Sequence, residues 1–224
     1  MPARSGDVSG DWPTSIAEAR AVQESLRERV EVGERRHGFR TVAGVDVHVA
    51  PATGLTWAAI AVVELATLEL RASALAAVPT GFPYVPGFLS FREIPAAVAA
   101  LRLLERPPDL LMVDGHGIAH PRRLGIAAHL GVLTGLPSVG VAKSRLVGRH
   151  DEPGPARGSR TLLSHQGETV GMVLRSRERA RPLYISPGHL VSLEQAVGLV
   201  EATLTGYRLP EPTRLADKLS RMHP

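Results

Sequence analysis

The chain has 224 residues, of which 44% are hydrophobic, and its formal net charge is +4, a length and composition that favour one domain over residues 1–224. It contains no cysteine, which excludes disulfides, cysteine-ligated zinc and thiol nucleophiles. No apolar run approaches the roughly 18 residues of a membrane span and no basic-then-apolar leader opens the sequence, so we expect a cytoplasmic protein without a membrane partner.

The first half of the sequence predicts a helix followed by three strands. Residues 1–12 are small and polar and predict a frayed start. A helix is predicted from Ser15, which forms a capping-box pattern with Glu18. Three strand patterns follow, and because short turns join them we expect an antiparallel meander: 41–50, 57–66 and 68–78.

The second half alternates helices and strands, which favours buried parallel strands. The predicted helices are 94–105, 122–135 and 192–204, with a last short helix capped by Thr213. The predicted strands are 108–115, 137–142, 168–176 and 181–186, with a mobile Pro/Gly-rich loop at 149–160. The expected fold class is therefore α/β, a mixed sheet of antiparallel meander and parallel strands flanked by helices.

Two aspartates stand out by their position on predicted strands. The two-residue period of 41–50 places Asp46 opposite a row of valines, where a charge is costly unless it is paired or faces solvent. Asp114 ends an apolar strand, at the edge where functional groups of open α/β sheets collect. If the two strands are neighbours, a divalent cation between the carboxylates would relieve their repulsion, and oxygen ligands favour Mg²⁺ or Mn²⁺.

Two further acids are candidates for the same site. Glu93 closes the segment YVPGFLSFRE, and Asp217 lies on the last predicted helix. Asp217 shares a helix face with Thr213, Ala216 and Ser220, so a solvated position remains an alternative for it.

Three other motif interpretations fit less well. His116 and His120 have zinc-pair spacing, but the glutamate of the zinc-hydrolase motif is missing and the flanking glycines and Pro121 oppose a helix. The glycine and lysine spacing before Lys143 is wrong for a phosphate-binding loop, so this lysine either holds a phosphate or is simply exposed. Ser186 lacks the frame of a nucleophile elbow.

Basic side chains crowd the middle third of the sequence: Arg122, Arg123, Lys143, Arg145, Arg149, Arg157 and Arg160. They are compatible with gripping a polyanion, and equally with a solvated basic face.

Several long motifs together resemble endonuclease V, a repair nuclease family that recognises deaminated bases. They are VAGVDV, YVPGFLSFRE, DLLMVDGHGIAHPRRLGIAAHLG, VGVAKSRLVG and SPGHLVSLEQA, in this order between about Val42 and Asp217. The resemblance implies a ribonuclease H-like sheet. It also implies Mg²⁺-dependent hydrolysis of the second phosphodiester 3′ of a deoxyinosine, leaving 3′-hydroxyl and 5′-phosphate ends.

The resemblance assigns a role to each site residue. Asp46 and Asp114 would be the metal ligands, with Glu93 positioning metal or water and Asp217 at a position of less certain role. His120 and Lys143 would stabilise charge near the scissile phosphate.

The segment Pro83-Tyr84-Val85-Pro86 resembles the family's strand-separating wedge. Its prolines restrict the backbone and its tyrosine ring offers a stacking face. Gly87, Leu89 and Gly115 would form the base pocket, with backbone N–H groups that donate to the 6-oxo group of hypoxanthine. A plain proline-rich surface turn is the alternative.

Three functional hypotheses follow. The first is the Mg²⁺-dependent deoxyinosine endonuclease, with damaged DNA as partner and no obligate protein partner. The second is a nucleic-acid-binding module with a decayed site, which intact carboxylates disfavour. The third is a nuclease for inosine-bearing RNA or for other damaged or mismatched DNA.

Overall fold

The computed structural model describes residues 12–33 and 38–222, so the predicted frayed start lies outside the described residues except for Trp12. The helices of this part are α1 (Ile16–Arg27), α2 (Leu89–Arg102), α3 (Ile126–Thr134), α4 (Leu193–Ala202) and α5 (Glu211–Ser220). The strands are β1 (Thr41–Ala50), β2 (Leu55–Glu64), β3 (Leu70–Pro79), β4 (Leu110–Val113), β5 (Ser138–Ala142), β6 (Arg160–His165), β7 (Glu168–Leu174) and β8 (Leu183–His189). None of the described helices is long and apolar enough to cross a membrane.

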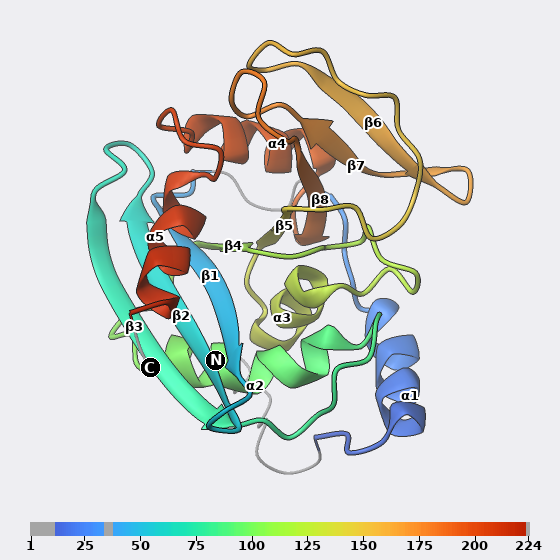
Figure 1. Ribbon diagram of the computed structural model, residues 1–224, viewed down its shortest axis with the longest axis vertical. Helices are drawn as coiled ribbons and strands as arrows, with labels where there is room; N and C mark the ends of the chain where they lie inside the picture. The colour runs from blue at the N-terminus through green and yellow to red at the C-terminus, as the bar shows by residue number, and fades with distance from the viewer. Residues whose placement is uncertain (1–11, 34–37, 223–224) are drawn as a thin grey trace.

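The strands form one mixed sheet in the order β3-β2-β1-β4-β5-β8-β7-β6 (Figure 1). β1, β2 and β3 make the predicted antiparallel meander, and β1, β4 and β5 run parallel to one another. The mixed fold class is thereby confirmed. Val45 pairs with Val113 in the parallel register, so the carboxyl end of β4 lies beside the middle of β1, next to Asp46.

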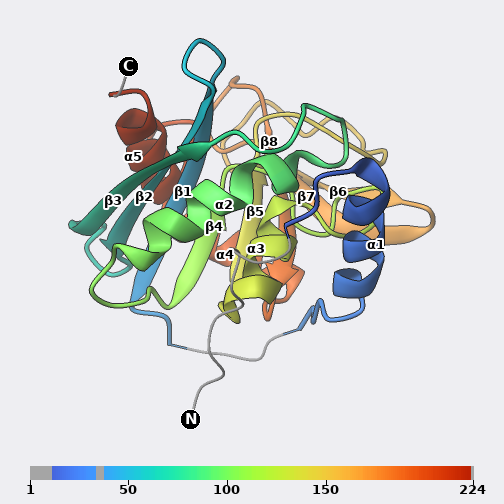
Figure 2. The ribbon, with the colours of Figure 1, turned by 90° about the horizontal axis from the view of Figure 1, so that it is seen from below.

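Helices cover both faces of the sheet (Figure 2). α2 and α3 pack on one face through a cluster that includes Val45, Ile60 and Ile94, whereas α4 packs on the other face around Met112. α5 lies on the same side as α4, over β1 and β2 (Figure 1). α1 is an outer layer that packs on α3 through Leu26.

The start of α2 differs from the prediction. The sequence predicts a helix from Ile94, with Pro95 in the first turn where a missing N–H costs nothing, but the helix already begins at Leu89. Pro95 therefore lies inside the helix and cannot donate to the carbonyl of Phe91. The indole Nε1 of Trp12 donates to that carbonyl instead, at 2.6 Å. A residue 79 positions away thus supplies the lost hydrogen bond.

The last helix also differs. Thr213 is not its cap, because α5 begins at Glu211 and the Thr213 hydroxyl is buried in the first turn, where it donates to the carbonyl of Pro210. The face of small residues that carries Thr213, Ala216 and Ser220 is the buried one. It approaches β1 closely, since a Cβ on Gly44 would lie 1.9 Å from the carbonyl oxygen of Pro212.

The segment predicted as a mobile loop is held by specific contacts. Arg149 pairs with Ser164 in an isolated β-bridge, and Arg175 donates to the carbonyl oxygens of Pro153 and Gly154. Strand β6 follows directly and is missing from the sequence prediction, because its alternation of polar and apolar residues is weak. A buried guanidinium, rather than regular structure, orders this segment.

Candidate active site

Three aspartates from separate elements converge at one end of the sheet. Asp46 lies within β1 and faces α5, Asp114 directly follows β4, and Asp217 lies on α5. One carboxylate oxygen of each lies within 4.8 Å of one of each of the others. The predicted pair is therefore brought together, and Asp217, which patterning left ambiguous, joins it because the small face of α5 turns toward the sheet.

Glu93 lies on α2 and lines the same acidic cavity as Asp46 and Asp114. Burial, reinforced by repulsion from the two aspartates, raises the pKa of Glu93 to about 8. Burial is also the main cause that raises the pKa of Asp46 to about 7. The acids thus sit where ionisation is costly unless a positive charge compensates it.

Lys143 follows β5 and supplies such a charge. Its Nζ lies 2.5 Å from Oδ2 of Asp114 and 2.8 Å from Oδ1 of Asp217. Burial alone lowers the pKa of Lys143, but the two carboxylates outweigh it and raise the pKa above its ordinary value. Of the two possibilities for this lysine, simple exposure is excluded in this structure.

The C-terminal end of α5 adds two more contacts to the cluster. The Ser220 hydroxyl donates to Oδ2 of Asp46, and Arg221 Nη2 lies 3.0 Å from Oδ1 of Asp217. Burial works to raise the pKa of Asp217, but the hydrogen bonds from Arg221 and Lys143 lower it below its ordinary value. Sequence patterning missed both residues, although each lies within four positions of Asp217.

The donor set fits a hard divalent cation. Three carboxylates from different elements can place oxygens around one centre, and a cation there would relieve the repulsion that burial intensifies. An ammonium group already bridges two of the three, which shows that a positive charge is accommodated at this point.

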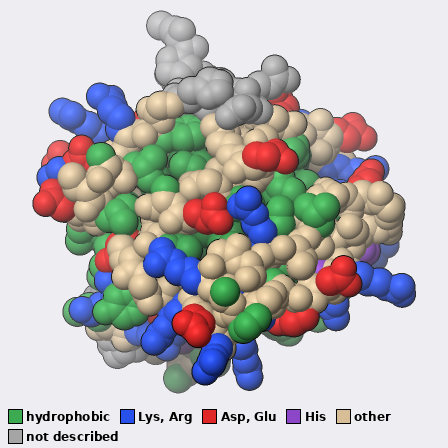
Figure 3. Space-filling model, turned by 90° about the horizontal axis from the view of Figure 1, so that it is seen from above, with side chains coloured by type: hydrophobic (Ala, Val, Ile, Leu, Met, Phe, Trp, Pro, Cys, Tyr) green, Lys and Arg blue, Asp and Glu red, His purple; other side chains and the backbone are tan. Residues whose placement is uncertain are grey.

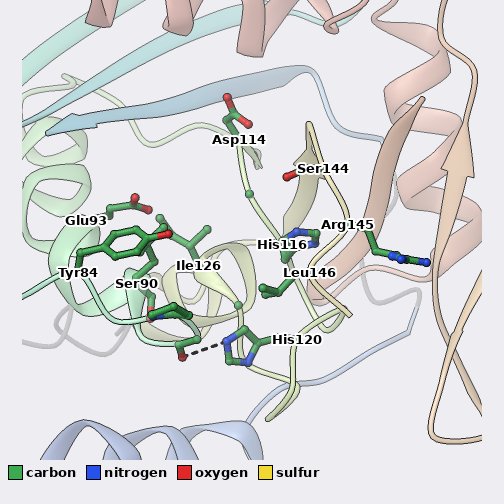
Figure 4. Close-up of a pocket in the computed structure, with 15 residues that line it drawn as sticks. Tyr84, Ser90, Glu93, Asp114, His116, His120, Ile126, Ser144, Arg145 and Leu146 are labelled. Atoms are coloured by element: carbon green, nitrogen blue, oxygen red, sulfur yellow. Dashed lines mark hydrogen bonds between the residues drawn. The ribbon is translucent and has the colours of Figure 1, made fainter. Parts of the chain in front are cut away.

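A second cavity, of about 290 Å³, adjoins the acids and shares Glu93 and Asp114 with their cavity. The predicted pocket residues Gly87, Leu89 and Gly115 all line it. Figure 4 shows Tyr84, Ser90 and Glu93 on one side of this cavity, with His116 and Leu146 on the other. Sequence reasoning missed further lining residues, namely Ser90, His116, Ile126, Ser144, Arg145 and Leu146.

The predicted wedge projects at the mouth of this cavity. The side chain of Tyr84 is 68% exposed, and Pro83 and Pro86 are exposed beside it. Val85 turns the other way and packs against the buried cluster of Phe82, Phe88 and Phe91. The packing of Val85 thus anchors the segment while the neighbouring Tyr84 ring stays exposed to solvent.

His120 lies at the base of the Tyr84 segment, in contact with Gly87. Its ring is buried and its Nε2 contacts the carbonyl oxygen of Gly87 at 3.1 Å (Figure 4), while Nδ1 accepts from the backbone N–H of Arg122. Burial, with the neighbouring positive charge of Arg122, lowers the pKa of His120 to about 3. The ring is therefore neutral and bonded within the protein, and a role of His120 in stabilising charge near the scissile phosphate stays a prediction.

The basic residues of the middle third do not form one open patch. Arg123 pairs with Glu168 and Arg160 with Glu201, and Arg122 turns inward onto the ring of Phe88. The face in Figure 3 likewise shows acidic and basic side chains interspersed, with hydrophobic ones between them.

Comparisons with known proteins agree with one another. Residues 24–218 match the family described as Endonuclease V. An Endonuclease V from Azotobacter vinelandii is 53% identical over 211 residues, which cover 94% of this chain and 96% of the relative.

Solved structures give the same result. The crystal structure of the Endonuclease V from Streptomyces avermitilis has a TM-score of 0.89 and 46% identity, covering 94% of this chain and 93% of that one. Endonuclease V from Ciona intestinalis, in complex with a 23mer DNA containing an inosine followed by a ribo-adenosine, has a TM-score of 0.81 and 27% identity, covering 92% and 95%. A family match over most of the sequence, and a relative of nearly equal length with half of its residues identical, establish that this chain is a nuclease of the endonuclease V family.

Proposed function

We propose that the protein nicks DNA beside deaminated bases, above all deoxyinosine, by hydrolysing the second phosphodiester on the 3′ side. The products would be 3′-hydroxyl and 5′-phosphate ends. The observation that carries this proposal is that two cavities adjoin and share Glu93 and Asp114. One cavity is lined by carboxylates, and the other is lined in part by the exposed Tyr84. A base in the second cavity would place its own strand's phosphates beside the acids.

Asp46 and Asp114 would hold Mg²⁺, for which Mn²⁺ would substitute, and Asp217 would complete the ligand set. The bound ion would lower the pKa of the attacking water and neutralise charge developing on the phosphate. Glu93, which lines both cavities, would orient that water or, as a carboxylate, accept its proton. Lys143 would contact the scissile phosphate once its carboxylate partners bind the metal.

The base would be read outside the duplex. An enzyme that inspects one base must take it out of the stack, and a rigid group must then support the gap. Tyr84 offers the stacking face, and the backbone around Gly87 and Gly115 offers N–H donors for the 6-oxo group of hypoxanthine. Adenine carries an amino group there, which cannot accept these hydrogen bonds.

Inosine-bearing RNA is the second candidate substrate. The Ciona oligonucleotide carries a ribo-adenosine after its inosine, which favours a site tolerant of ribose at that position. We expect the chain to act as a single domain without an obligate protein partner.

Cleavage of a labelled inosine duplex in Mg²⁺ tests the proposal. A matched adenine duplex, an inosine RNA of the same sequence and an EDTA control accompany it. We expect one nick, displaced by one nucleotide from the lesion's own 3′ phosphate, and none in EDTA. An uncut inosine duplex, or equal cleavage of the adenine duplex, would refute the proposal.

A further inference from the structure

The segment that carries Tyr84 ends in a tight turn. The N–H of Phe88 donates to the carbonyl of Val85 at 2.9 Å, and Gly87, the third residue of the turn, has φ of +81°. With Pro86 in second place, these features define a type II turn. The turn leaves the carbonyl of Gly87 free to accept from elsewhere.

Three side chains converge on this single carbonyl oxygen. Gln23 Nε2 donates to it at 2.9 Å, Arg122 Nη2 at 2.6 Å and His120 Nε2 at 3.1 Å. Because Nδ1 of His120 accepts from a backbone N–H, Nε2 carries the ring hydrogen and is the donor. A carbonyl has two lone pairs, so three donors saturate it, and one of them is charged.

The Gly87 carbonyl and its donors Gln23, His120 and Arg122 form what we call the carbonyl node, and Arg122 makes two further contacts in this region. Its Nε donates to the amide oxygen of Gln23, and its guanidinium lies 4.1 Å from the centroid of the Phe88 ring. Gln23 lies on α1 and is completely buried, so both ends of its amide are committed. A Cβ on Gly87 would come within 2.9 Å of Arg122 Nη2, so the position requires glycine for its φ and for the approach of the donors.

The prolines of the segment do not explain how it is aimed. Pro83 and Pro86 fix φ at two positions, which stiffens the backbone locally but does not set its direction relative to the cavity. The carbonyl node does set it, because its donors come from α1 and from the loop before α3. α1 carries none of the three aspartates, and Arg122 lies eight residues beyond Asp114 in the connection between β4 and α3.

We propose that Gln23 and Arg122 are positioning residues for recognition of the damaged base. Through the Gly87 carbonyl they hold the Tyr84 prong, which is the exposed tyrosine of the wedge segment Pro83-Tyr84-Val85-Pro86, in place. This inference rests on the proposed function, because it presumes that the prong engages DNA. It assigns to two residues outside the acidic site a role in substrate selection and none in metal binding.

Arg122→Met tests this assignment, with Arg123→Met as the matched control. Arg123 is the next residue in the chain, but its guanidinium bonds to Glu168 and the His165 carbonyl instead of Gly87.

Single-turnover cleavage measured at increasing enzyme concentration gives the half-saturating concentration and the maximal rate separately. Loss of the charge-assisted hydrogen bonds from Arg122 to Gly87 and Gln23 predicts about 10-fold weaker half-saturation on the inosine duplex. We expect less than about a 3-fold change in maximal rate, because the metal ligands are untouched. Arg123→Met should keep the wild-type half-saturation, and Arg122→Lys should restore part of the loss.

A double variant separates positioning from general damage. If Arg122 acts through the prong, adding Arg122→Met to Tyr84→Ala should weaken half-saturation by less than about 2-fold beyond Tyr84→Ala alone. Mn²⁺ binding by calorimetry should equal that of the wild type in both. If Arg122→Met does not fold, Gln23→Met is measured in its place, with the same expected direction and the same dependence on Tyr84.

The outcomes are distinct. A wild type without preference for inosine refutes the proposed function and this inference with it. A wild type with that preference, combined with unchanged half-saturation in Arg122→Met and Gln23→Met, overturns the inference alone. Effects of Arg122→Met and Tyr84→Ala that multiply fully also overturn it.

Discussion

The carboxylate cluster and the Tyr84 prong meet at one cavity but are ordered by opposite means. In the cluster, burial is the main cause that raises the pKa values of Asp46 and Glu93, and repulsion between the acids adds to it. In the prong, the Tyr84 ring is exposed, Val85 packs against buried phenylalanines, and hydrogen bonds to the Gly87 carbonyl fix the turn that follows. The cluster needs a positive charge, which Lys143 supplies in this structure and which a bound cation would supply in our proposal, whereas the prong is held by contacts within the protein. Perturbing one should therefore leave the other intact.

The largest effect is expected for Asp46→Asn. This change removes an anionic ligand with little change in shape, and because metal catalysis contributes several kcal/mol we expect a loss of cleavage of about 1,000-fold. The metal-free variant should also melt at a higher temperature than the wild type, because a buried charge is gone. Cleavage assays and thermal melts in EDTA measure the two effects.

Asp109→Asn is the matched control for this variant. Asp109 accepts from the backbone N–H groups of Arg40 and Thr41, at the other end of β4 from Asp114. Its loss should lower the melting temperature and leave cleavage unchanged. Equal losses of cleavage in the two variants would contradict a special role for Asp46.

Tyr84→Ala should have the next largest effect. Loss of one base-stacking platform predicts about 10-fold to 30-fold weaker engagement of the inosine duplex, while Mg²⁺ affinity stays unchanged. Half-saturation of single-turnover cleavage and calorimetric Mg²⁺ titration report the two quantities. Tyr207→Ala, at another exposed tyrosine, is the control. Equal weakening of metal and DNA binding would contradict the separation of the two regions.

Lys143→Met tests whether this lysine competes with a metal ion for the carboxylates. The ammonium of Lys143 occupies two of the carboxylates that a metal would use, so its removal should tighten Mn²⁺ binding by about 5-fold while slowing cleavage. Isothermal calorimetry on DNA-free protein measures this directly. Unchanged or weaker Mn²⁺ binding would show that the lysine does not compete with metal.

The smallest effect is expected in the pH dependence of stability. The raised pKa values of Asp46 and Glu93, about 7 and about 8, lie above the unfolded values near 4. The folded state therefore holds more protons, and the free energy of unfolding falls as pH rises from about 4 to about 8. In EDTA we expect the melting temperature to drop by about 5 °C between pH 6.5 and 8.5. Saturating Mg²⁺ should shrink this drop, and a drop of equal size with and without Mg²⁺ would contradict it.

Much of the fold could be predicted because local and tertiary signals agree. The Ser15 capping box forms as predicted, and β1 has its predicted bounds because its alternation is clear on both faces. α2 begins earlier than predicted because its Pro95 is compensated by Trp12, a contact that no local pattern reveals.

The site was predictable in part, for the same reason. Asp46 and Asp114 stand out in the strand patterns, and the parallel register of β1 and β4 places the end of β4 beside the middle of β1, where Asp46 lies. The placement of Asp217 required knowing that small residues, and not leucines, form the packed face of α5. The carbonyl node could not be predicted, because it forms only where α1, the loop before α3 and the turn at Gly87 meet. Spacing along the chain carries no signal for such a meeting.

Anomalous diffraction from crystals soaked in Mn²⁺ would locate the ion relative to the carboxylates. We expect a single strong peak in direct ligand contact with carboxylate oxygens of both Asp46 and Asp114, with the Lys143 ammonium displaced from Asp114. A peak bound by only one of the two aspartates, or no peak at this end of the sheet, would contradict this expectation.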